Sequence, residues 1–170
     1  MRCVLPAETV LGGASAAWAL GLRPAILNDR VEVVQPVGHR LRSRPELRVR
    51  RDRLVVGEVV QTTFGPATSA ARTAFDLARR GGLLRSVAAL DAMLRVTGVG
   101  IEEVFAVATA HPGVRGLRLA AQAMPLADSR SESPRESMLR VVLVRAELTA
   151  PVPQFDVRDC GRFVARLDLA

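Results

Sequence analysis

The spacing of apolar residues changes at Thr68, from a pattern typical of strands to one typical of helices. Before Thr68, runs rich in β-branched and alternating apolar residues lie between turn-forming residues, at 31–37, 47–51 and 54–60. A short helix over 15–20 precedes them, ended by Gly21 and Pro24. After Thr68, apolar residues at helical spacing predict helices over 69–80, 83–95, 101–110 and 114–124. The pattern predicts an α+β fold, with a small antiparallel sheet followed by a helical segment.

A polar stretch, 127–134, predicts a linker between two parts of the chain. Ser133 as N-cap, Pro134 in the first helical position and Glu136 in a capping box then predict a helix to about residue 146. Two strands, 154–158 and 162–169, form a hairpin around a three-residue turn that ends at Gly161. We expect one domain over 1–127, β-rich to residue 64 and helical from 65, and a second part over 128–170.

All 24 cationic side chains are arginine, and the formal net charge is +7. A GC-rich coding bias explains part of this excess, but residues 1–80 hold 13 arginines against 7 acids, whereas residues 81–170 hold 11 against 10. The arginines concentrate in one run, at Arg40, Arg42, Arg44, Arg48, Arg50, Arg51 and Arg53. Arginines at alternate strand positions share a face and bind phosphates, so this run predicts a nucleic-acid contact. The alternative is a solvated sheet face, because the run has no aromatic residue for base stacking.

Several classes of protein are excluded or disfavoured. The longest uncharged run, 9–22, is too short and too rich in glycine to cross a bilayer. Two distant cysteines, Cys3 and Cys160, indicate a reducing compartment, and we expect a cytoplasmic protein. A chain without lysine has no phosphate-binding GxxxxGKS loop, and no GxGxxG motif is present.

Three carboxylates are candidates for a catalytic site: Glu132, Glu136 and Asp168. Acids from a helix N-terminus and a strand together are suitable ligands for Mg²⁺. The spacing also allows a structural interpretation, with Glu136 in the capping box and Asp168 paired with Arg166.

Several segments, in this order, resemble a group of actinobacterial proteins. They are 10–22 (VLGGASAAWALGL), 65–78 with its TSxxRTxxDLA pattern, 132–137 (ESPRES) and 166–170 (RLDLA). In its first part the group resembles the AbiEi-type antitoxins of type IV toxin–antitoxin systems. Its last part is similar to the very-short-patch-repair (Vsr-like) endonuclease domain of the restriction-endonuclease superfamily.

The resemblance implies an incomplete restriction-endonuclease-like α/β domain in which Glu136 is the acid of the first helix. It also implies that Gln154 is the polar residue opening the first hairpin strand and that Asp168 is the metal-binding acid. The usual N-terminal DNA-binding module and the strand with the remaining metal ligands are missing, so the resemblance implies a member truncated at both ends. We therefore expect a nucleic-acid-associated protein without catalytic activity of its own.

Two alternatives stay open. If the gene continues past residue 170, the product is a Mg²⁺-dependent DNA endonuclease; otherwise no cofactor is expected. The other alternative is a protein-interaction module, whose hairpin binds a cognate toxin or a second copy of the chain. Neither alternative involves a membrane.

Overall fold

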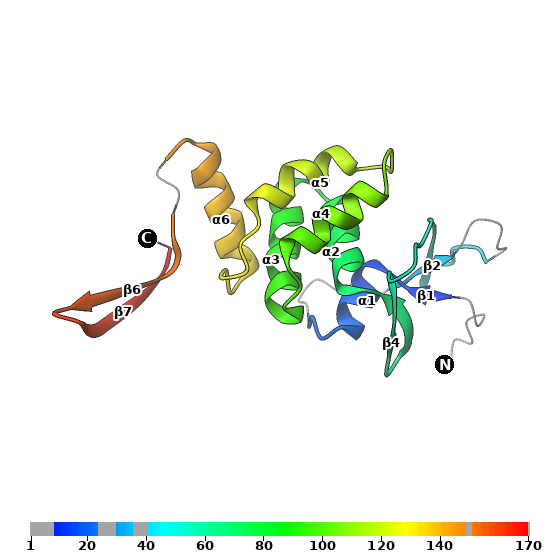
Figure 1. The fold of residues 1–170 in the computed structure, drawn as a ribbon, viewed down its shortest axis with the longest axis horizontal. Coiled ribbons are helices and arrows are strands. Elements are labelled where there is room, and N and C mark those ends of the chain that lie inside the picture. The colour runs from blue at the N-terminus through cyan, green and yellow to red at the C-terminus, as the bar shows by residue number, and fades with distance from the viewer. Residues whose placement is uncertain (1–8, 24–29, 36–40, 149–150, 170) are drawn as a thin grey trace.

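The protein is described by a computed structural model, which covers residues 9–23, 30–35, 41–148 and 151–169 (Figure 1). A sheet lies at one end of the molecule, helices form the middle, and a two-stranded hairpin extends from the other end. Among the described helices, none is long and apolar enough to cross a membrane.

The sheet is mixed, and the prediction of an antiparallel sheet was wrong. Its strand order is β3-β2-β1-β5-β4. The strands are β1 (Val10–Leu11), β2 (Val31–Gln35), β3 (Leu47–Arg51), β4 (Val59–Thr62) and β5 (Gly65–Thr68). β2 runs parallel to β3, and β1 to β5, whereas β1–β2 and β4–β5 are antiparallel. Parallel pairing of β2 with β3 rules out the tight turn that would join an antiparallel pair.

The helices lie close to their predicted positions. They are α1 (Gly13–Ala19), α2 (Ala70–Ala78), α3 (Leu83–Thr97), α4 (Ile101–Ala110), α5 (Leu117–Ala123), the 3-10 helix η1 (Met124–Leu126) and α6 (Pro134–Arg145). Phe75, Leu90, Met93 and Val104 are fully buried and form the centre of the apolar core between the helices. Val141 of α6 belongs to the same core, so α6 packs with the helices that precede it.

The segment predicted as a linker is fixed to α3. The carboxylate of Asp91 accepts hydrogen bonds from the backbone N–H of Asp128 and from Arg140 Nη2, each at 2.7 Å. Arg140 also donates to the carbonyl of Leu126 at 2.7 Å, and Ser131 is buried. These contacts hold residues 126–131 and α6 against the helical core, while the boundary at 127/128 stays a prediction.

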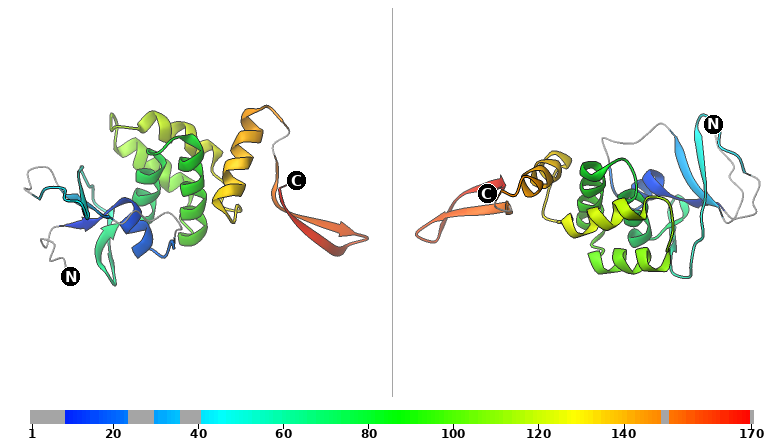
Figure 2. Two further views of the ribbon diagram at one scale, coloured as in Figure 1. Left: turned by 180° about the vertical axis from the view of Figure 1, so that it is seen from behind. Right: turned by 90° about the horizontal axis from the view of Figure 1, so that it is seen from above.

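The C-terminal hairpin consists of β6 (Pro153–Asp159) and β7 (Arg162–Leu169), as predicted, and projects away from the helices (Figure 2). Its turn has two residues, not three, because Cys160 and Gly161 both adopt positive φ, at 46° and 81°. The register shifts between Val157 and Arg158, so Phe163 lies opposite Arg158, whereas Leu167 lies opposite Phe155. This bulge places Phe163 on the other face from Leu167, and the single apolar face predicted for β7 is split.

Candidate nucleic-acid interface

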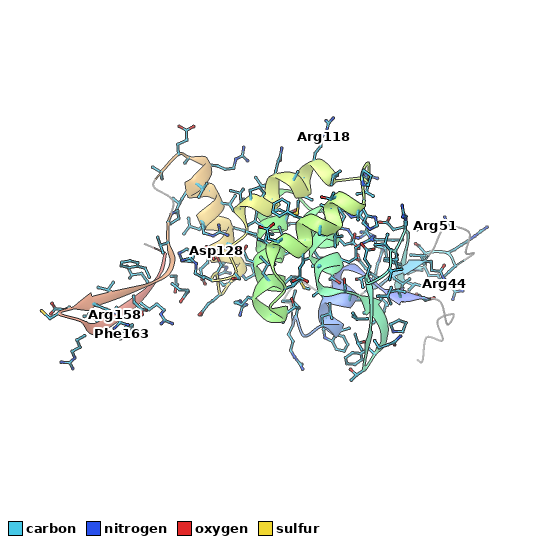
Figure 3. The ribbon with its side chains drawn as sticks, viewed as in Figure 1. Arg44, Arg51, Arg118, Asp128, Arg158 and Phe163 are labelled. Carbon is cyan, nitrogen blue, oxygen red and sulfur yellow. The ribbon has the colours of Figure 1, made fainter. Side chains whose placement is uncertain are left out.

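The arginine run lies on β3, an edge strand of the sheet, and on the segments that flank it. Arg42, Arg44, Arg48, Arg51 and Arg53 are exposed, and Arg50 is half-buried; Arg40 lies outside the described residues. Figure 3 shows Arg44 and Arg51 extending from the sheet end of the molecule, away from the helices. The edge of the sheet therefore presents positive charge to solvent.

One pair of alternate arginines does not project freely. Arg48 and Arg50 share a face of β3, as predicted, but this face carries Glu32 of β2. The Glu32 carboxylate lies 3.3 Å from Arg48 Nη1 and 4.0 Å from Arg50 Nε. Arg80, just after α2, donates to Glu32 at 3.0 Å, so three guanidinium groups share one carboxylate.

Burial and the neighbouring positive charges together change the pKa of two of these guanidinium groups. Burial, together with the neighbouring charge of Arg50, lowers the pKa of Arg80 to about 10. Burial also lowers the pKa of Arg50. Arg50 Nε, Arg80 Nε and Arg80 Nη2 are buried without a hydrogen-bond acceptor. Arg80 Nη2 also lies 4.0 Å from Asp76, which itself pairs with Arg72 and Arg79, so cations outnumber acids on the interior side of the arginine edge.

A buried network of charges lies behind this edge and is centred on Arg72 of α2, which is 0% exposed. Arg72 belongs to the TSxxRTxxDLA pattern. Its Nη1 donates to Glu58 at 2.7 Å and to the carbonyl of Arg53 at 2.9 Å, and its Nε donates to Asp76 at 3.2 Å. Asp52, just after β3, lies 3.0 Å from Arg72 Nη2. Arg72 thus fastens the end of β3 to α2.

The other polar residues of the pattern extend the network, together with Arg79 and His111, which lie outside it. Thr68 and Thr73 hydroxyls are 2.7 Å apart, and Ser69 caps α2. Arg79 pairs with both Asp52 and Asp76. His111, at the end of α4, is buried, and its Nε2 lies 2.7 Å from Glu58 Oε1. The same Nε2 also lies 3.0 Å from Arg72 Nη1, so His111 contacts both members of the Arg72–Glu58 ion pair. The pattern therefore joins sheet and helices, a role that its sequence alone does not reveal.

Two further residues, Arg30 and Ser43, belong to the arginine edge but lie outside the predicted set. Arg30 precedes β2, and the parallel register pairs Val31 with Leu47, which brings Arg30 beside the beginning of β3. Arg30, Ser43, Arg44, Leu47 and Arg48 line a pocket of about 400 Å³. Arg30 lies outside the arginine run in sequence, so the charge pattern does not indicate it. The pairing of β2 with β3 is needed to assign Arg30 to this edge.

The candidate catalytic residues are only partly brought together. Glu136 Oε2 accepts from the backbone N–H of Glu132 at 3.0 Å and from Gln154 Nε2 at 3.3 Å. The Ser133 hydroxyl accepts from the Glu136 N–H, so Ser133 is the N-cap, as predicted. The Glu136 carboxylate accepts from the N–H of Glu132 and not from that of Ser133, so only half of the predicted capping box is present. Asp168 is exposed. The expected ion pair of Asp168 with Arg166 is absent, because Arg166 pairs with Asp156 across the hairpin at 2.8 Å.

A magnesium site at these acids does not fit the described residues. Among them, no group of three or more His, Cys, Asp or Glu side chains is placed to hold a metal ion. The Glu136 carboxylate is bonded to the backbone N–H of Glu132 and to the amide of Gln154, so neither contact brings a second carboxylate to it. We therefore derive no catalytic step through a metal.

Together, the fold and the site define an α+β module with a basic sheet edge supported by a buried charge network. Residues 9–126 match the family of the AbiEi antitoxin C-terminal domain, and the chain belongs to this family. The resemblance to AbiEi-type antitoxins is thereby confirmed, while similarity to Vsr-like endonucleases stays a prediction.

Two relatives of the chain are mycobacterial. The uncharacterized proteins Rv2248 and MT2308, from two strains of Mycobacterium tuberculosis, are each 29% identical over 169 residues, covering 98% of this chain and 62% of theirs. The chain thus spans about three-fifths of the length of these relatives. The crystal structure of the RV2827C protein from M. tuberculosis is similar with a TM-score of 0.52 at 18% identity, over 86% of this chain and 55% of that chain. This similarity supports the α+β fold alone.

Proposed function

We propose that the protein is an antitoxin-type module that associates with nucleic acid through the arginine edge of its sheet and does not itself cleave it. The observation that carries the proposal is the group of exposed arginines on and beside β3. Guanidinium groups bind phosphate oxygens in pairs, and clustered arginines on one edge of a domain are the electrostatic signature of phosphate-backbone binding.

The buried network supports this proposal because it holds the edge in place. Asp52 and the carbonyl of Arg53 are both bound to Arg72, so the chain leaving β3 is fixed to the helical core. A pre-organised set of cations loses less conformational entropy on binding than a flexible arm does.

The experiment is a fluorescence-anisotropy titration of a labelled DNA duplex at several salt concentrations. We expect the logarithm of the binding constant to fall linearly with the logarithm of salt concentration. The triple variant Arg42→Ala, Arg51→Ala and Arg53→Ala should bind more weakly and show a salt slope reduced by about one for each phosphate that it no longer binds. The matched control removes three exposed arginines from the helices, by Arg85→Ala, Arg118→Ala and Arg135→Ala. Absence of duplex binding at low salt, or an equal decrease in both triple variants, contradicts the proposal.

An antitoxin module also implies a protein partner. The hairpin exposes Phe155 and Leu167, which lie opposite each other on one face. We propose this face as the contact for a cognate toxin or a second copy of the chain, since exposed strands and apolar patches favour association. Co-purification with a candidate toxin encoded beside the gene tests whether a toxin binds this face. We expect the original protein to co-purify with the toxin and Leu167→Glu to lose this co-purification.

An endonuclease is the second candidate function, and the contact of Glu136 with Gln154 favours it, because the family resemblance assigns both residues to one site. The corresponding assay is nicking of a supercoiled plasmid with Mg²⁺, by this chain and by a product extended past residue 170. Under this alternative the extended product nicks DNA and Asp168→Asn abolishes the activity. Full activity in Asp168→Asn would exclude the assignment of Asp168.

A further inference from the structure

The pocket at the beginning of β3 has a rigid frame. Arg44 and Leu47 exchange two backbone hydrogen bonds, of 2.8 and 3.1 Å, which close a tight turn over Pro45 and Glu46. The backbone N–H of Val49 donates to the Ser43 hydroxyl at 3.0 Å, and the N–H of Val31 donates to the Glu46 carbonyl at 2.8 Å. The turn is therefore tied both to its own strand and to β2.

The lining of this pocket is cationic. Three of its five residues are arginines, at positions 30, 44 and 48, and Leu47 is buried. Within the described residues, neither Arg30 nor Arg44 has a carboxylate at 4.0 Å or less. Glu46, in the same part of the chain, has no described arginine within that distance of its carboxylate. In the part of the chain that the structure describes, the cations of the pocket therefore outnumber the acids that contact them, which is a reason for the pocket to bind an anion.

The one acid behind the pocket cannot neutralise it. Arg48 contacts Glu32, but that carboxylate also serves Arg50 and Arg80. Ser43 adds a hydroxyl that accepts from Val49 and keeps its own O–H free to donate. Guanidinium N–H groups and a hydroxyl around one concave site match the several acceptor oxygens of a phosphate.

We propose that Arg30, Ser43, Arg44 and Arg48 form a discrete binding site for one phosphate group. If the phosphate belongs to a nucleic-acid backbone, the inference rests on the proposed function and specifies where one backbone phosphate is bound. If the phosphate is a free ion, the inference does not depend on the proposed function. Arg30 distinguishes this site from the rest of the arginine edge. It directly precedes β2, whereas the other arginines of the edge lie on or beside β3.

The first arm of the test uses inorganic phosphate. Backbone amide resonances are followed by NMR during a phosphate titration, with sodium chloride of equal ionic strength as the reference. We expect saturable shifts confined to residues near 30 and 43–48, and an affinity that falls about tenfold or more in Arg30→Gln, the decrease expected for one charge-assisted hydrogen bond. Arg118→Gln, an exposed arginine on α5 far from the pocket (Figure 3), should leave the affinity unchanged.

The second arm repeats the duplex titration with Arg30→Gln. If the site holds a backbone phosphate, this variant reduces the salt slope by about one, and inorganic phosphate competes with the duplex more strongly than chloride does. If phosphate binds saturably but duplex affinity is unchanged, the source is a free phosphate. Shifts that do not saturate, or that persist equally in Arg30→Gln, overturn the site. The proposed function is tested separately, because its triple variant leaves all four pocket residues intact.

Discussion

Arg72 is a charged residue at the centre of the molecule, and its position decides how the sheet and the helices meet. Three carboxylates, from Asp52, Glu58 and Asp76, surround its guanidinium group. Burial of so many charges is tolerated only because each has a partner of opposite charge. The most specific part of the family resemblance therefore has a structural meaning, which is the joining of β3, the turn before β4, and α2.

We expect Arg72→Met to destabilise the protein by about 3–5 kcal/mol, because it leaves buried carboxylates without their shared cation. Urea denaturation followed by circular dichroism measures the change. Arg118→Met, which replaces an exposed arginine in the same way, should stay within about 0.5 kcal/mol of the original protein. A difference of that small size for Arg72→Met would show that the network does not stabilise the fold.

Glu136 has a structural role that pH reveals. Partial burial acts to raise its pKa, but hydrogen bonds from Ser133, the Glu132 N–H and Gln154 prevail and hold the pKa below its ordinary value of 4.5. The carboxylate therefore stabilises the folded state fully above that value, and this contribution is lost as the pH falls through the folded-state pKa.

The corresponding variant is Glu136→Gln, which should lower the free energy of unfolding by about 0.3–1 kcal/mol at pH 7, since it removes a negative charge from a helix N-terminus. The difference from the original protein should shrink as the pH falls below about 4.5. Glu147→Gln, at the opposite end of α6, should have no destabilising effect, because a negative charge there opposes the helix dipole. A difference for Glu136→Gln that is independent of pH argues against stabilisation by the charged carboxylate.

At the scale of elements, the close approach of α1 to β2 depends on glycine. Gly13 begins α1 with a φ of +52°, and a β-carbon at this position would lie 2.0 Å from Glu32 Oε2 and 2.7 Å from Arg80 Nη1. Gly12 also approaches Val34 of β2. The glycine pair in the segment 10–22 is thus needed where the helix meets the charged face of the sheet.

Gly13→Ala should therefore lower the free energy of unfolding by more than the penalty for placing alanine at a positive φ. Gly57 has a φ of +87° and open space around it, so Gly57→Ala measures the conformational penalty by itself, about 1 kcal/mol. We expect Gly13→Ala to exceed this by at least about 1 kcal/mol, because Glu32 and Arg80 must move apart. Equal destabilisation of the two variants in thermal or urea denaturation would contradict the role of close packing.

At the scale of the whole molecule, basic and apolar surfaces lie at opposite ends. The arginine edge ends the sheet, and the hairpin extends beyond α6 on the far side (Figure 1). Phe155 and Leu167 are 45% and 44% exposed on one face of the hairpin, and Phe163 is 53% exposed on the other. A two-stranded hairpin with exposed apolar faces is marginally stable in water, which favours a partner at this end.

In the absence of a partner protein, we expect the chain to self-associate through the hairpin. Sedimentation velocity should show an average mass that rises with protein concentration, and Leu167→Glu should lower this association by placing a charge on the apolar face. Arg85→Glu on α3 serves as the control for the change in charge. A single monomeric species at high concentration rules out self-association and leaves the toxin as the expected partner.

The sequence alone determined most elements, because their signals are local. The helices follow from apolar spacing and from caps such as Ser133, and the hairpin from Gly161 between two strands. The tertiary structure decided what depends on strand pairing: the parallel register of β2 and β3, which brings Arg30 to the pocket, and the bulge that separates Phe163 from Leu167. It also decided which charges are buried: Arg72 and Arg118 are both arginines on predicted helices, but only Arg72 is buried. Burial and pairing are set by residues distant along the chain, and no local pattern records them.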